Sequence, residues 1–117
     1  MTHVFDLTEA NFEQAIAEPT PLLVDFTAAW CPPCRAIAPH VEAIAAAHAG
    51  RLRVAQCDVD TQVRIATRYD VRSMPTLLLL VAGRVVGGIV GAVPRAKIEA
   101  LVHRAFDEVR APREQKR

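Results

Sequence analysis

The sequence has no excess of charge of either sign. Its 14 lysine and arginine residues stand against 13 aspartate and glutamate residues, which leaves a formal net charge of +1 at pH 7. The two signs are interspersed along the chain, so the sequence offers no basic stripe of the kind that follows a phosphate backbone. We therefore expect no nucleic-acid partner.

The chain also lacks the segments that direct a protein to a membrane. Its first residues, MTHVFDLTEANFEQ, contain neither the basic nor the apolar region of a secretory signal, although a mature chain whose signal had been removed would begin in the same way. The longest apolar stretch, residues 74–93, contains Pro75, Arg84 and four glycines, which predicts two strands and a turn rather than a membrane span. We expect a cytoplasmic protein with no membrane partner.

Cysteine is scarce, and its spacing is uneven. Three cysteines cannot close a disulfide framework, and only Cys31 and Cys34 lie close in sequence, which favours catalytic or metal-binding use. A structural staple or half of a zinc site is the alternative interpretation of this pair. A structural zinc site usually needs four protein ligands, however, and Cys57 and the scattered histidines supply no second paired spacing, so we expect no metal. Cys57 is expected to be a small buried hydrophobic residue.

What the chain does have is a hydrophobic pattern typical of one compact α/β domain. Half of its 117 residues are hydrophobic, enough for one core, and we expect the domain to span residues 1–111, with a frayed tail at 112–117. The predicted strands and helices alternate in the order βαβαβαββα, which implies a mixed central sheet between helices. The strands are expected near 4–6, 22–27, 52–60 and in a hairpin over 76–90, and the helices over 8–17, 34–48, 61–70 and 94–109.

Local signals predict where several of these elements begin or turn. Thr8 is expected to cap the first helix, with Leu7 and Phe12 at the positions of a hydrophobic staple. The hairpin is expected to turn at residues 82–83. Pro94 is expected to start the last helix, with Val93 as a poor cap.

The stretch AAWCPPCRAIAP, residues 28–39, places the cysteine pair between a buried strand and a helix. The sulfur of Cys31 should then lie near free amides and the positive end of the helix dipole, where thiolate is favoured. Cys34 follows one turn later, close enough to attack a mixed disulfide formed at Cys31. Pro32 and Pro33 fit the first helical turn, where the amides have no intrahelical partner. Asp25 is the one charge in the apolar run LLVDFT, and burial there should raise its pKa.

Three separated motifs, VDFTAAWCPPC, VRSMPTLLLL and GGIVGAV, together resemble the thioredoxin family over roughly residues 5–106. The resemblance implies a thioredoxin fold, with a mixed five-stranded sheet and four helices. It also implies a general protein-disulfide reductase that exchanges a dithiol for a disulfide and needs no bound cofactor. Its partners would be an electron donor similar to thioredoxin reductase and proteins that contain disulfides. We expect a monomer.

The same resemblance assigns roles to individual residues. Cys31 would be the attacking thiol and Cys34 the resolving one, while Asp25 would relay the proton for Cys34. The Met74–Pro75 bond would be cis, and the Met74 backbone would pair with an extended substrate segment. The residues that resemble the apolar rim of that docking groove are Trp30, Met74, Gly91 and Ala92.

Two departures from the family pattern affect the site. Pro32 stands where most members have glycine, which should change the redox potential. Thr27 and Gln56 stand where members commonly have tryptophan and lysine. Without the lysine, Asp25 loses a cationic neighbour, which should leave its pKa higher than in typical members.

Two other functions remain open from the sequence. The residues between the cysteines strongly affect the favoured direction of exchange, so an oxidase or isomerase is the alternative within redox chemistry. From a different class, the domain would be a partner-binding module that uses the groove near Trp30 and Pro75 while its thiols are incidental.

Overall fold

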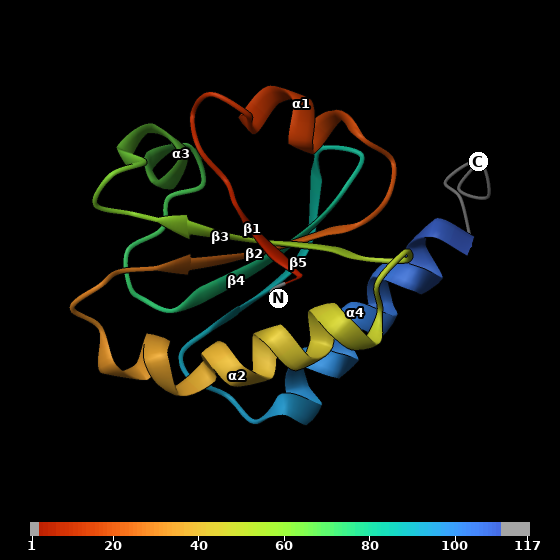
Figure 1. The fold of residues 1–117 in the computed structure, drawn as a ribbon. Coiled ribbons are helices and arrows are strands. Elements are labelled where there is room, and N and C mark those ends of the chain that lie inside the picture. The colour runs from red at the N-terminus through yellow and green to blue at the C-terminus, as the bar shows by residue number, and fades with distance from the viewer. Residues whose placement is uncertain (1–2, 111–117) are drawn as a thin grey trace.

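The computed structural model describes residues 3–110, which form a mixed five-stranded sheet with helices on both faces (Figure 1). The element order is the predicted one. The predicted frayed tail at 112–117 lies outside the described residues. The elements are β1 (Val4–Asp6), α1 (Phe12–Ala17), β2 (Leu22–Thr27), α2 (Pro32–Ala47), β3 (Arg53–Asp58), α3 (Val63–Arg68), β4 (Thr76–Val81), β5 (Arg84–Val90) and α4 (Arg95–Arg110).

The sheet has the strand order β1-β3-β2-β4-β5. The first three strands run parallel, whereas β4 is antiparallel to β2 and β5 is antiparallel to β4. β2 is therefore central, and residues 22–26 are all buried, as its almost continuous apolar run predicts. Within it, Asp25 pairs with Gln56 of β3 and with Leu77 of β4.

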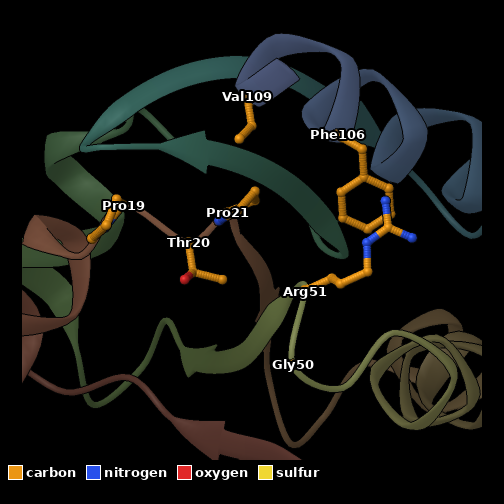
Figure 2. Close-up of a pocket in the computed structure, with 7 residues that line it drawn as sticks. All are labelled: Pro19, Thr20, Pro21, Gly50, Arg51, Phe106 and Val109. Carbon is orange, nitrogen blue, oxygen red and sulfur yellow. The ribbon is translucent and has the colours of Figure 1, made fainter.

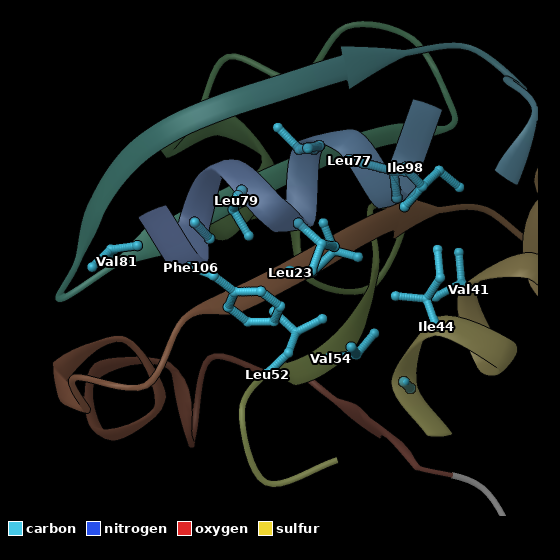
Figure 3. Close-up of a cluster of buried hydrophobic side chains, with 14 of the residues drawn as sticks. Leu23, Val41, Ile44, Leu52, Val54, Leu77, Leu79, Val81, Ile98 and Phe106 are labelled. Atoms are coloured by element: carbon cyan, nitrogen blue, oxygen red, sulfur yellow. The ribbon is translucent and has the colours of Figure 1, made fainter. Parts of the chain in front are cut away.

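Two helices cover each face of the sheet. α2 and α4 lie on one face and α1 and α3 on the other (Figure 1). Figure 3 shows the larger core, in which side chains of β2, β3 and β4 face those of the two long helices. Its members include Leu23, Val41, Ile44, Val54, Leu77, Leu79, Ile98 and Phe106. The second core joins α1 and α3 to the other face through residues such as Phe12, Ile16, Phe26 and Ile65. Packing on both faces fixes β2, and β2 leads directly into the cysteine pair.

α2 has both prolines in its first turn and therefore begins two residues before the alanine-rich run at 34–48. Cys31 is the N-cap residue, and Pro32 and Pro33 occupy the first turn, as predicted from their missing amide hydrogens. The helix passes Pro39 and ends at Ala47. The cysteine motif thus stands at the N-terminal end of one of the two 16-residue helices on this face.

The prediction that Thr8 caps the first helix is wrong, because α1 begins at Phe12 and Asn11 is its N-cap residue. The amide of Thr8 donates to Asn11 Oδ1 at 2.8 Å, and the amide of Asn11 donates to Thr8 Oγ1 at 3.3 Å. This reciprocal pair closes a separate turn before the helix. Leu7 and Phe12 are nevertheless both buried, in the same core.

At the other end of the chain, the predicted start of α4 is off by one residue. The helix begins at Arg95, and Pro94 directly precedes it, with its carbonyl accepting a hydrogen bond from the Lys97 amide at 3.0 Å. The predicted hairpin is confirmed, since β4 and β5 are joined by Ala82 and Gly83, both at positive φ. Within residues 3–110, no helix is both long and apolar enough to cross a membrane.

Candidate active site

The two cysteines of the CPPC motif form a disulfide at the start of α2. Their Cα atoms are 5.3 Å apart. The backbone amide of Cys34 points at Cys31 Sγ, at a distance of 3.3 Å. Because Pro32 and Pro33 have no amide hydrogen, this is the first amide of the helix that reaches the sulfur. In the reduced protein, the amide and the helix dipole would both favour a thiolate on Cys31.

Two loops from distant parts of the chain meet the disulfide. The Met74–Pro75 peptide bond is cis, as the resemblance implies. The Met74 carbonyl oxygen lies 3.7 Å from Cys31 Sγ, and the Pro75 carbonyl accepts a hydrogen bond from the Gly91 amide at 2.8 Å. Gly91 has a φ of +102°, and no atom lies within 4 Å of the position of a Cβ there. The fold therefore brings the segments at 31–34, 74–75 and 91 together and leaves open space above Gly91.

The surface around the disulfide is apolar and partly exposed. Both cysteines pack with Ala28, Val59 and Met74. Trp30 is 62% exposed, and its indole Nε1 donates a 2.8 Å hydrogen bond to Asp60 Oδ2. Trp30 is thus a surface residue of the site rather than part of a core.

Sequence reasoning missed the contributions of Val59 and Asp60. Both follow the last residue of β3, and each meets the CPPC region only in space, about thirty residues away along the chain. No local motif singles them out. The one available signal is their position at the carboxyl end of a parallel strand, which meets the carboxyl end of β2 at the same edge of the sheet.

The side chain of Asp25 is buried on β2 and has no hydrogen-bond partner among the described residues. Only 4% of the residue is exposed, and its Oδ1 is buried and unpaired. Burial raises its pKa from 3.8 to about 6, as predicted from its place in an apolar strand. Its neighbour Gln56 adds no positive charge, and the Gln56 amide instead donates to Asp6 Oδ1 at 3.2 Å.

The remaining cysteine plays no part in the disulfide. Cys57 is a free, fully buried thiol on β3. Burial, with a further contribution from Asp58, raises its pKa to about 12, so it stays a protonated thiol at neutral pH. Among residues 3–110, no three His, Cys, Asp or Glu side chains are placed to hold a metal ion.

The arrangement has the parts needed for thiol–disulfide exchange. A cysteine at a helix N-terminus is bridged to a second cysteine one turn later, beside an exposed tryptophan and the open space above Gly91. A carboxyl group that titrates near neutral pH lies on the strand that precedes them. Reduction of the disulfide yields a dithiol that can carry two electrons to another disulfide.

Comparisons with known proteins agree with this chemistry. The sequence model of the family described as Thioredoxin matches residues 3–104. A thioredoxin of Alicyclobacillus acidocaldarius subsp. acidocaldarius is 46% identical over 94 residues, which cover 80% of this chain and 90% of that protein. Thioredoxin C-2 of Corynebacterium nephridii is 39% identical over 100 residues, covering 85% and 93%. Among solved structures, a mutant thioredoxin from Halobacterium salinarum NRC-1 is similar, with a TM-score of 0.78 and 29% identity over 87% of this chain and 88% of that one.

Proposed function

Because this chain belongs to the thioredoxin family, and is therefore a thiol–disulfide oxidoreductase, we propose that it is a general protein-disulfide reductase with Cys31 as its nucleophile. The observation that carries the proposal is the Cys34 amide directed at Cys31 Sγ, at the positive end of α2. That environment lowers the free energy of the Cys31 thiolate, and the thiolate is the form that attacks a disulfide.

The exchange proceeds in two steps whose electrons balance within the dithiol. The Cys31 thiolate attacks one sulfur of a substrate disulfide, a mixed disulfide forms, and the other substrate sulfur leaves as a thiolate that takes up a proton. Cys34, once deprotonated, attacks Cys31 Sγ and releases the second substrate thiolate. The substrate gains two electrons, and the protein is left with the Cys31–Cys34 disulfide found in the structure.

Asp25 accepts the proton of Cys34 in the second step. The support for this role is its position on the strand before the motif and a pKa of about 6, which lets the carboxyl exchange protons near neutral pH. Because no cation neutralises it among the described residues, it behaves as a weak acid rather than as a permanently charged group.

Substrates dock in the groove formed by Trp30, Met74, Pro75, Gly91 and Ala92. The free space above Gly91 and the Met74 carbonyl beside Cys31 support this assignment, because an extended segment needs close approach to the backbone and a backbone partner there. The exposed indole of Trp30 adds an apolar edge on the other side of the disulfide.

The physiological setting follows from the family. Disulfide-containing proteins and a reductase that returns electrons are the general partners of thioredoxins. For this chain we place the reaction in the cytoplasm and take the protein to be a monomer with a single domain, residues 1–111. The one connected sheet of the described residues supports the single domain.

The test is a trapping experiment with Cys34→Ser. Removing the resolving thiol should leave substrate proteins bound to Cys31 as mixed disulfides that dithiothreitol releases, whereas the matched variant Cys31→Ser should trap none. Trapping by Cys31→Ser instead would reverse the two roles. If the Cys31→Ser, Cys34→Ser double variant keeps full function in a partner assay, the domain is a binding module and the reductase proposal is wrong.

The reduction potential separates a reductase from an oxidase or isomerase. Pro32 lies between the cysteines, where it can alter the potential. A value near about −270 mV, typical of thioredoxins, supports a reductase, and a value of about −180 mV or higher supports an oxidase or isomerase. Trp30 beside Cys31 gives the fluorescence signal for the equilibrium with a glutathione or dithiol buffer.

A further inference from the structure

A hollow of about 470 Å³ lies at the end of the molecule away from the disulfide. It is bordered by the segment before β2, the loop between α2 and β3, and the last turns of α4 (Figure 2). α2 starts beside Cys31 and ends near this hollow, and its 16 residues span about 24 Å. A ligand here would not touch the redox centre.

The walls of the hollow are mainly apolar. In Figure 2, the side chains of Phe106 and Val109 extend from α4, and those of Pro19 and Pro21 lie in the segment before β2. Val109 is 50% exposed, whereas the other large apolar residues of α4 are buried. The volume falls in the range of pockets that take small organic molecules.

Arg51 brings a positive charge to this apolar hollow. Its guanidinium carbon lies 3.9 Å from the centre of the Phe106 ring (Figure 2). Within residues 3–110, Arg51 forms no ion pair and its side chain makes no hydrogen bond. The ring restrains one face of the guanidinium, and its N–H groups remain available to an anion.

Two carboxylates close to the hollow along the chain face other cations. Glu18 lies 3.6 Å from Arg53, and Glu108 lies 3.1 Å from Arg84. Arg53 also holds the segment before β2 in place, since it donates to the Thr20 carbonyl at 2.7 Å. The wall is therefore preformed, and Arg51 is the charge left for a ligand.

We propose that this hollow binds a small amphipathic acid, with an apolar group of about phenyl size and one carboxylate. The apolar group packs between Pro21, Phe106 and Val109. The carboxylate pairs with the guanidinium of Arg51, whose planar fork can donate two parallel hydrogen bonds. Nothing in the redox chemistry requires this site, so it is a second function of the domain.

The test is an NMR titration of the full-length oxidised protein with 3-phenylpropionate, compared with its neutral analogue 3-phenylpropionamide. Saturable shifts of the Thr20, Gly50 and Val109 amides are expected with the acid. The amide should bind about three- to fivefold more weakly, which is the effect of one partly exposed ion pair. The variant Arg51→Gln should weaken acid binding by the same factor and make acid and amide equal, whereas the control Arg64→Gln on α3 should change neither.

A second variant tests the proposal independently, in case Arg51→Gln rearranges the loop that carries it. Val109→Asp places a carboxylate on an exposed wall position and should reduce acid binding more than amide binding. Equal affinities of acid and amide in the unaltered protein would overturn the proposal, as would shifts that do not saturate or that map elsewhere. Binding seen only in a chain that ends at Arg110 would also overturn it, because residues 111–117 would then exclude the ligand from the complete protein.

Discussion

Two charged side chains, Asp25 on β2 and Arg53 on β3, are largely removed from water within one sheet, but only Arg53 has partners. Arg53 donates to the carbonyl oxygens of Ala15, Glu18 and Thr20 at 2.6, 3.5 and 2.7 Å. Its Nε makes no hydrogen bond among the described residues but lies 3.6 Å from the Glu18 carboxylate. The side chain of Asp25 makes no hydrogen bond with any residue between 3 and 110, and its Oδ1 is buried.

Burial disfavours the charged form of both groups, and the presence of partners decides whether each group stays charged at neutral pH. Desolvation lowers the pKa of Arg53, but the Glu18 charge opposes it and the group stays charged. For Asp25, desolvation acts alone and brings the pKa to about 6. The comparison teaches that a buried charge with partners can stabilise the fold, whereas one without partners destabilises it, which fits the proton-acceptor role that we propose for Asp25.

The largest effect is expected from removing the charge that has partners. Arg53→Met keeps the apolar stem but leaves the three carbonyl oxygens without their donor, so the free energy of unfolding should fall by about 3 kcal/mol. Urea denaturation at pH 7 measures it. The matched control Arg84→Met breaks an exposed pair with Glu108 and should lose less than about 1 kcal/mol. Equal losses in the two variants would contradict the structural role of Arg53.

Removing the charge of Asp25, which has no partner, should instead raise the free energy of unfolding. Well below its unfolded pKa of 3.8, Asp25 is protonated in both states and has little effect on stability. As the pH rises from 3.8 to about 6, the unfolded chain ionises before the folded one, and above about pH 6 this costs the folded state up to about 3 kcal/mol. Asp25→Asn should therefore be more stable by about 2 kcal/mol at pH 7, and this gain should shrink as the pH falls through that window and vanish well below pH 3.8. A gain that does not depend on pH would mean that burial of the charge is not its cause.

The same variant tests what the destabilised carboxyl is for. Asp25→Asn should slow the attack of Cys34 on the mixed disulfide about tenfold near neutral pH and flatten its pH dependence, because the proton acceptor is gone. Stopped-flow fluorescence of Trp30 follows this step. The control Asp58→Asn, on the neighbouring strand, should leave the rate and its profile unchanged. An unchanged rate in Asp25→Asn between pH 5.5 and 7.5 would rule out the proton-acceptor role.

The smallest effect is expected from giving Asp25 a neighbour of opposite charge, as Arg53 has in Glu18. Gln56 pairs with Asp25 across the strands, so Gln56→Lys places a cation near it, and the Asp25 pKa should fall by about half to one unit. An NMR titration of the Asp25 carboxyl carbon measures this. Gln14→Lys, on the exposed face of α1, is the matched control and should not move it. A higher Asp25 pKa in Gln56→Lys would show that the new side chain buries the carboxyl instead of pairing with it.

The fold was predictable where a pattern extends over many residues. The apolar run of β2, the hairpin at residues 82–83 and the element order all follow from periodicity and turn chemistry, and all are confirmed. The start of α1 was not predictable in this way, because Thr8 and Asn11 are both good caps and each bonds the amide of the other. Helix propensity alone does not distinguish a turn that precedes a helix from its first turn.

The site was predictable to the extent that its chemistry is local in sequence. The cysteine pair, its prolines and the isolated Asp25 are visible in two short stretches. Two other features could not be predicted in this way: the hydrogen bond from Trp30 to Asp60, and the hydrogen bonds from Arg53 to three carbonyl oxygens. The partners in these bonds lie 30 to 38 residues apart along the chain.

The sequence by itself determined the family, the order of strands and helices and the identity of the redox pair, because each depends on residue type and short spacing. Tertiary structure alone decided which charge on the sheet has partners, which amide faces Cys31 Sγ, and that Arg51 stacks on Phe106 at the far end of α2. The physical reason is that desolvation and hydrogen bonding depend on distance in space, and packing of helices on the sheet is what brings residues that are far apart in sequence within a few ångströms.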